Sequence, residues 1–300
     1  ATPSETAGLG AVLALVLIMG HEFCGTVVDT GRCGQRFSQG VRVVSNSLVA
    51  CRRCVSCQRG DEHLCRNRQL FGMHRPGAFA EFVAVPEHCL FLIPPTLKPE
   101  AACLTEPLAN GVHMVRLTAD LSPKRVLVIG AGPIGLLAQQ AFRAMTGAQV
   151  FVSDPNPRRL AVASAVGAVR VIDPSQEDVV AVTRELTGGE GADVVVDAVG
   201  SEQTKRQSVQ AVRPGGAVVW IGLAQDEINL GSLGVTLAEI RIHGTYAARP
   251  SDMSKAIDLL ARGSVSTAAW VTLAPLKEGA DLFRRMLAAK YDAIKGVIVL

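Results

Sequence analysis

The second half of the chain alternates between short apolar runs and longer stretches in which apolar residues recur at helical spacing. Short runs rich in Val and Ile favour strands buried in a parallel sheet, and the longer stretches favour helices that cover it. The six expected strands lie at 125–129, 149–153, 169–172, 193–197, 217–222 and 240–246. The expected helices lie at 136–146, 156–166, 176–187 and 202–212. This alternation predicts an α/β fold with a complete doubly wound parallel sheet.

The first apolar run, Leu9 to Met19, is too short to cross a membrane. It has eleven residues, whereas a helix that crosses a bilayer needs about 20. Glu5 precedes the run and no Lys or Arg does, so an export signal is not expected. We predict a buried strand or a short helix here, in a cytoplasmic protein with reduced thiols.

Composition and charge narrow the class of protein. The 300 residues are 48% apolar and 19% charged, which supports a hydrophobic core, and the length suits two domains. Thirty Lys and Arg against 27 Asp and Glu leave a net charge of +3. Such a balance gives no support to a nucleic-acid partner or to binding at a membrane surface.

Four of the eight cysteines form the cluster Cys51-x2-Cys54-x2-Cys57-x7-Cys65. Thiolates at this spacing can converge on one centre and leave no open coordination position, which is typical of a structural zinc. A redox Cys-x-x-Cys pair or an iron–sulfur cluster is the alternative, but the last gap is long and no proline follows it. We predict a structural zinc lobe over residues 51–65.

A glycine-rich loop follows the first expected strand of the sheet and opens a helix. It reads Gly130-Ala131-Gly132-Pro133-Ile134-Gly135, and this setting is the one in which G-x-G-x-x-G binds a dinucleotide. Gly130 permits the tight turn, Gly132 lets a pyrophosphate approach the backbone, and Gly135 lets helix and strand pack closely. Pro133 and Ile134 begin the helix, whose N-terminus attracts the phosphates.

Asp154 follows the second expected strand, nineteen residues after Gly135. An acid at this place binds the adenosine ribose 2′-hydroxyl and repels a 2′-phosphate, so NAD is favoured over NADP. Arg158 and Arg159 lie nearby and could instead serve a phosphate. Asp154 could also be an ordinary helix cap before Pro155, and this role is compatible with ribose binding.

Three further motifs complete a recognisable set, namely Gly20-His21-Glu22, Pro76-Gly-Ala-Phe-Ala-Glu-Phe82 and Glu106-Pro-Leu-Ala109. With the four-cysteine lobe and the glycine-rich loop, the chain resembles the zinc-containing medium-chain alcohol dehydrogenases from about Met19 to Leu300. The Glu106-Pro107 pair makes it most similar to the polyol and threonine dehydrogenase branch.

The resemblance implies a mainly β, GroES-like catalytic domain over residues 1–110 and 249–300, and a Rossmann domain over 111–248 that binds NAD. The substrate cleft is expected between them. Lys295 matches a basic position that in the family reaches the cofactor pyrophosphate, although a lysine here could also be a solvated residue at a strand edge.

The resemblance also implies a catalytic zinc. His21 and Glu106 match zinc ligands of the branch, and Glu22 matches a ligand or a group behind the ligands. An imidazole and carboxylates leave an open coordination position for an alcohol, whose hydroxyl the metal makes more acidic. The expected reaction is hydride transfer from a secondary alcohol of a polyol, sugar alcohol or hydroxy amino acid to NAD, giving a ketone.

One family segment has no counterpart here. The family carries Cys-Gly-x-Asp-x-His before Gly-His-Glu, which supplies a zinc ligand and a proton relay, but this chain has no cysteine before Cys24. Cys24 lies three residues after His21, on the opposite face of a strand, so we leave it out of the ligand set. Residues 1 to about 18 match nothing in the family by inspection. Either an N-terminal segment is missing, or the catalytic metal site is incomplete.

Two other functions therefore stay open. The chain could be an NAD-binding pseudoenzyme, or a truncated family member, without an intact catalytic zinc site. A zinc-independent quinone reductase is disfavoured, because that branch has no use for the four-cysteine lobe. His74 is either a residue of a surface loop or a residue at the border of the substrate cleft. A homo-oligomer, dimer or tetramer, is expected from the family.

Overall fold

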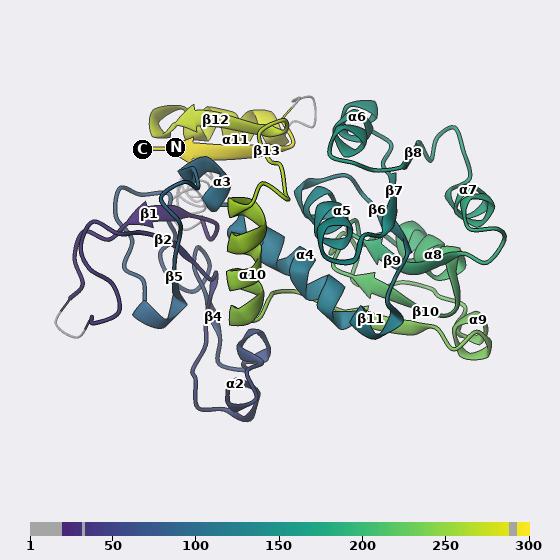
Figure 1. Ribbon diagram of the computed structural model, residues 1–300, viewed down its shortest axis with the longest axis horizontal. Coiled ribbons are helices and arrows are strands. Elements are labelled where there is room, and N and C mark those ends of the chain that lie inside the picture. Colours follow the sequence, from purple (N-terminus) through teal and green to yellow (C-terminus); the bar gives the residue numbers. More distant parts are fainter. Residues whose placement is uncertain (1–19, 32–33, 288–292) are drawn as a thin grey trace, which may run out of the picture. The chain divides into compact units, whose positions relative to one another are not determined.

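The computed structural model describes residues 20–31, 34–287 and 293–300, so the run Leu9 to Met19 lies outside the described residues (Figure 1). The chain divides into two compact units. The first is built from residues up to Glu106 with Arg249–Ala261 and Trp270–Leu300, and the second from Pro107–Ala248 and Arg262–Ala269. The unit changes after Glu106, whereas the resemblance implied a boundary at 110.

The second unit contains a six-stranded parallel sheet. Its strands are β6 (Arg125–Ile129), β7 (Gln149–Ser153), β8 (Arg170–Ile172), β9 (Ala192–Asp197), β10 (Val212–Trp220) and β11 (Arg241–Gly244). Their order is β11-β10-β9-β6-β7-β8, and all neighbouring pairs are parallel. The chain runs from β6 to one edge and returns to β9 on the other side of β6, so the strand order reverses between β6 and β9. Ligands of such sheets bind beyond the carboxyl ends of the strands at this reversal.

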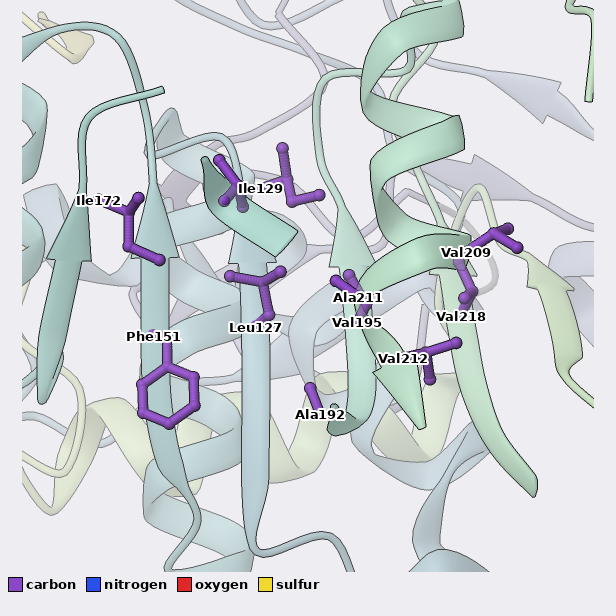
Figure 2. Packing of buried hydrophobic residues seen from close by; sticks show 11 residues of the cluster. Leu127, Ile129, Phe151, Ile172, Ala192, Val195, Val209, Ala211, Val212 and Val218 are labelled. Carbon is purple, nitrogen blue, oxygen red and sulfur yellow. The ribbon is translucent and has the colours of Figure 1, made fainter. Parts of the chain in front are cut away.

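One helix precedes the first of these strands, and the others connect the strands. The helices are α4 (Thr105–Leu117), α5 (Pro133–Thr146), α6 (Pro157–Ala165), α7 (Val179–Leu186), α8 (Glu202–Ala211) and the short α9 (Ser232–Leu237). Side chains of neighbouring strands pack with α7 and α8 in one buried cluster on one face of the sheet, and Figure 2 shows Leu127, Phe151 and Val195 among them. The short apolar runs of the sequence therefore form the core of this unit.

Several small sheets belong to the first unit. One is antiparallel, with order β1-β2-β5 (Cys24–Thr26, Arg42–Ser45 and Leu90–Leu92), and β3 (Leu48–Val49) pairs with β4 (Gln69–Leu70). β12 (Val271–Pro275) and β13 (Lys295–Val299) are parallel. The helices of this unit are α2 (Val55–Gln58), α3 (Pro99–Ala102), α10 (Pro250–Ala261) and α11 (Gly279–Leu287). Phe71, Cys89 and Val49 form a core against Phe23, whose ring meets Phe71 edge to face at 5.9 Å.

Within the described ranges, no helix has the length and apolar character that a membrane crossing requires.

Candidate active site and zinc-binding lobe

The four clustered cysteines come together at one point. Their sulfur atoms all lie within 4.8 Å of one another, with 3.5 Å between Cys54 and Cys57 and 4.0 Å between Cys51 and Cys57. Four sulfurs bound to one tetrahedral zinc lie about 3.8 Å apart, given Zn–S bonds of about 2.3 Å. The sulfurs therefore fit a single ion, whereas an iron–sulfur cubane would spread its cysteines over separate iron atoms.

Backbone N–H groups of this lobe stabilise the thiolate form of two of its cysteines. Backbone N–H groups of Arg53 and Cys54 lower the pKa of Cys51 to about 6, and the N–H of Cys57 also lowers the pKa of Cys54. Burial raises the pKa of Cys57 to about 12 in the absence of a cation. Metal binding releases such a proton, because the ligand is the thiolate.

The glycine-rich loop has the shape that its sequence predicts. Gly130 has a φ of +100°, and a Cβ placed on it would lie 2.8 Å from Cγ2 of Val199. A Cβ on Gly135 would lie 1.7 Å from the carbonyl oxygen of Gly130, so helix α5 approaches the loop too closely for a side chain. A Cβ on Gly132 would meet nothing within 4 Å. Gly132 is thus open for a ligand, and it is the N-cap of the 14-residue α5.

Asp154 is buried at the carboxyl end of β7, where its carboxylate contacts the glycine-rich loop. Oδ2 accepts a hydrogen bond from the N–H of Ala131, and Oδ1 accepts one from Asn156, both at 2.8 Å. The cap of helix α6 is Asn156 rather than Asp154, which corrects the expectation of an ordinary helix cap. Nη1 of Arg159 lies 3.7 Å from Asp154 Oδ2.

His21, Glu22 and Glu106 form the second cluster of possible metal ligands. One ligand atom from each lies within 4.8 Å of the others, and His21 Nε2 is 3.8 Å from Glu22 Oε1. His21 and Glu22 precede β1, and Glu106 is the second residue of α4. One imidazole and two carboxylates fit a zinc ion that keeps an open position. Cys24 does not belong to this cluster of described ligand atoms.

Burial and mutual charge set the protonation of this cluster. Burial, and next the charge of Glu22, raise the pKa of Glu106 to about 7, so the two carboxylates resist being charged together without a cation. Burial lowers the pKa of His21, although Glu22 acts in the opposite direction. A neutral imidazole is the form that binds a metal.

Three features, two of them at this cluster and one at the end of β9 in the second unit, were missed or only partly foreseen from the sequence. The hydroxyl of Ser47 donates a 2.6 Å hydrogen bond to Glu106 Oε1. The ammonium of Lys295 forms an ion pair with Glu22 Oε2; its expected contact with a cofactor pyrophosphate stays a prediction. Asp197, wholly buried at the end of β9, accepts the N–H groups of Val199 and Gly200. Only Asp197 carried a local signal, since an acid ends an apolar strand there.

His74 has a structural role in a turn. Its Nδ1 accepts the N–H of Leu70 at 3.1 Å, and the residue is exposed. This geometry favours the interpretation of a surface loop.

Comparison with known proteins now identifies the family. Residues 5–95 match the family model for the alcohol dehydrogenase GroES-like domain, and residues 133–262 match the one for zinc-binding dehydrogenase. L-Galactonate-5-dehydrogenase of Escherichia coli (strain K12) is 34% identical over 282 residues, which cover 94% of this chain and 82% of that enzyme. The chain belongs to the zinc-binding alcohol dehydrogenase family.

Other relatives agree. L-Threonine 3-dehydrogenase of Chelativorans sp. (strain BNC1) is 32% identical over 284 residues, covering 95% of this chain and 81% of that one. A putative zinc-binding dehydrogenase from Sinorhizobium meliloti 1021, solved bound to NADP, superposes with a TM-score of 0.87 at 33% identity, covering 94% of this chain and 83% of that one.

As a zinc-binding alcohol dehydrogenase, the chain is an oxidoreductase for hydroxyl groups that uses zinc and NAD(P). The predicted GroES-like and Rossmann folds are confirmed. The expectation that residues 1 to about 18 match nothing in the family is wrong, because the match to the GroES-like model begins at residue 5.

Proposed function

We propose that the chain oxidises a secondary alcohol of a small polar molecule, such as a polyol, sugar alcohol or hydroxy amino acid, to a ketone, with NAD as the hydride acceptor. The observation that carries the proposal is the convergence of His21, Glu22 and Glu106, whose ligand atoms lie within 4.8 Å of one another. A zinc ion bound there would supply the positive charge that makes a substrate hydroxyl more acidic. The names of the relatives support this substrate class.

The chain's own residues divide the remaining work. His21 and Glu106 hold the metal, and Glu22 either completes the ligand set or orients it through its ion pair with Lys295. Gly132 and the start of α5 at Pro133 and Ile134 receive the cofactor phosphates.

The preference for NAD over NADP rests on Asp154. Its carboxylate lies at the end of β7, beside the glycine-rich loop, where it can accept a ribose hydroxyl and repel a 2′-phosphate. Arg159 lies beside the Asp154 carboxylate. The negative charge of Asp154 offsets part of the positive charge of Arg159, which could otherwise attract a 2′-phosphate.

A second candidate is an NAD-binding protein without turnover. It is favoured by one observation: among the residues that the structure describes, the second cluster contains no cysteine, the ligand that the family's Cys-Gly segment supplies. Such a protein would keep the four-cysteine lobe and the nucleotide site.

Zinc per chain, measured by elemental analysis on chelator-washed protein, tests the proposal together with an alcohol panel. Two zincs per chain and NAD-dependent oxidation of a polyol or hydroxy amino acid support the first function. One zinc, with NADH binding but no oxidation, selects the second. A His21→Ala variant is the matched control, since it should lose one zinc and keep the other.

Assembly and location are also proposals. A dimer or tetramer is supported by the edge strand β11, which pairs only with β10 in the described sheet, and by the exposed Leu233 and Leu237 of α9. A cytoplasmic location is supported by the seven free cysteines among the described residues.

A further inference from the structure

We propose that Ser47 is a positioning residue of the His21–Glu22–Glu106 site, where its hydroxyl holds the Glu106 carboxylate in the orientation that binds metal. Ser47 lies in the turn between β2 and β3 and is 2% exposed. Its Oγ is 2.6 Å from Glu106 Oε1, across 59 positions of sequence. The inference rests on the proposed function, because it assumes that this cluster binds a metal.

Backbone hydrogen bonds to two other segments hold the turn that contains Ser47, and they therefore fix the position of its hydroxyl. The carbonyl of Ser47 accepts the N–H of Phe71, which is wholly buried, at 3.1 Å. The N–H of Asn46 donates to the carbonyl of Cys89 at 2.8 Å, and the Asn46 side chain accepts the N–H of Leu48. The turn is therefore tied to β4 and to the start of β5.

Glu106 needs such a partner more than most carboxylates do. It stands in the first turn of α4 with three rotatable side-chain bonds, and one of its ligand atoms lies within 4.8 Å of one on Glu22, which is also a carboxylate. A repelled carboxylate on a flexible stem has reason to turn away from its neighbour. A hydrogen bond from a fixed hydroxyl restrains these torsions and orients the carboxylate, which is what partners behind a metal ligand do.

A neighbouring serine shows that the bond is not a by-product of the turn. Ser45 is equally buried, at 1% exposed, but its hydroxyl donates to the carbonyl of Asn46 at 2.8 Å, within the turn itself. The hydroxyl of Ser47 instead crosses to Glu106. Substitution of Ser45 therefore tests the contribution of a hydroxyl to the turn, and substitution of Ser47 tests its contribution to the site.

The test measures metal affinity on the full chain, with zinc or cobalt(II) added to chelator-treated protein and the four-cysteine site followed by its thiolate absorption. Ser47→Ala should weaken the second metal 10- to 100-fold, the loss typical when a partner behind a ligand is removed. Ser45→Ala should bind the second metal as the wild type does, and Ser47→Thr, which keeps the hydroxyl, should retain most of the affinity. An occupied four-cysteine site shows that each variant is folded.

Three outcomes would overturn the inference. Wild-type affinity for the second metal in Ser47→Ala would do so and leave the proposed function intact. Equal losses in Ser45→Ala and Ser47→Ala would assign the effect to the turn rather than to the hydroxyl. A wild-type chain that takes up only one metal would remove the proposed function and this inference together. If Ser47→Ala does not fold, Ser47→Gly removes the same hydroxyl without adding a side chain.

Discussion

Asp154 shows how one side chain can serve both the fold and the ligand. Its carboxylate accepts the N–H of Ala131 in the glycine-rich loop, and the proposed function assigns it a second role, binding the ribose of the dinucleotide. A substitution here must therefore be interpreted with two measurements, one of stability and one of cofactor choice.

We expect Asp154→Ala to weaken NAD binding and to reduce the preference of the protein for NAD over NADP. The loss of an acceptor for a buried N–H should also lower the free energy of unfolding by about 1–3 kcal/mol. Asp154→Asn keeps an acceptor oxygen but removes the charge, so it should lose less stability and still discriminate poorly. Dissociation constants for both cofactors and urea unfolding measure the two effects. An unchanged ratio of the two constants would refute the ribose assignment.

Asp193 predicts how the stability of the Rossmann-type unit depends on pH. Burial alone would raise the pKa of Asp193, but Arg213 and the N–H groups of Arg125 and Lys124 outweigh it and lower the pKa. A lowered pKa in the folded state adds stability above the unfolded value, about 3.9, and this stability is lost as the pH falls through the folded value. Asp193→Asn should cost about 2–3 kcal/mol at pH 7 and less at pH 3. An equal cost at both pH values in urea unfolding would contradict this.

Residue contacts differed in how far the sequence could predict them. Asp154 was predictable as an acid at the end of an apolar strand, and its binding to a ribose stays a prediction. Ser47 was not, because its partner Glu106 is remote in sequence and serine is common in turns.

At the scale of elements, the interior of the sheet was predicted best. β6 and β7 have the predicted bounds, since continuous apolar runs bounded by turns leave little choice. β10 begins at Val212 rather than 217, because a register irregularity between Val212 and Ala217, with Gly215 at a φ of +68°, hides its first residues. Helix α9 was missed because it is short and contains Gly234.

The strand–loop–helix element makes a separable prediction for its glycines. Gly135→Ala should destabilise the protein by more than about 2 kcal/mol, because its Cβ would collide with the carbonyl oxygen of Gly130. Gly132→Ala should cost less than about 1 kcal/mol, because its Cβ meets nothing, but it should weaken NAD binding where the pyrophosphate needs that space. Thermal unfolding and cofactor titration distinguish the two. Full NAD affinity in Gly132→Ala would argue against the pyrophosphate position.

At the scale of the whole molecule, the small sheets of the first unit could not be derived from periodicity. Strands of two to four residues, such as β3 and β1, are too short to show an alternating pattern. Motifs carried the prediction there, because metal ligands are recognisable even where strands are not. We therefore expect metal bound in the four-cysteine lobe to contribute more to the stability of this unit than its small hydrophobic core does.

Removal of the structural zinc is expected to affect the two units unequally. Chelation, or Cys54→Ser, should lower the unfolding temperature of the first unit by at least about 5 °C, since four neighbouring thiolates, two of them buried, lose their common cation. Hydrogen exchange should rise across residues 51–65 while β6 and β9, in the core of the second unit, keep their protection. Equal loss of protection in both units would mean that the lobe stabilises the whole chain.

The interrupted course of the first unit has a consequence for synthesis on the ribosome. Its parts are separated by residues 107–248, and β12 must wait for β13, which contains Lys295, before it gains its parallel partner. All residues of the second unit are synthesised before Trp270, and its sheet, which ends with β11, emerges from the ribosome before β12 and β13 do. The second unit can therefore fold first during translation. Until β13 is made, the first unit lacks the partner of β12. If translation stops before β13 is made, the second unit should therefore fold, whereas the first unit should remain incomplete.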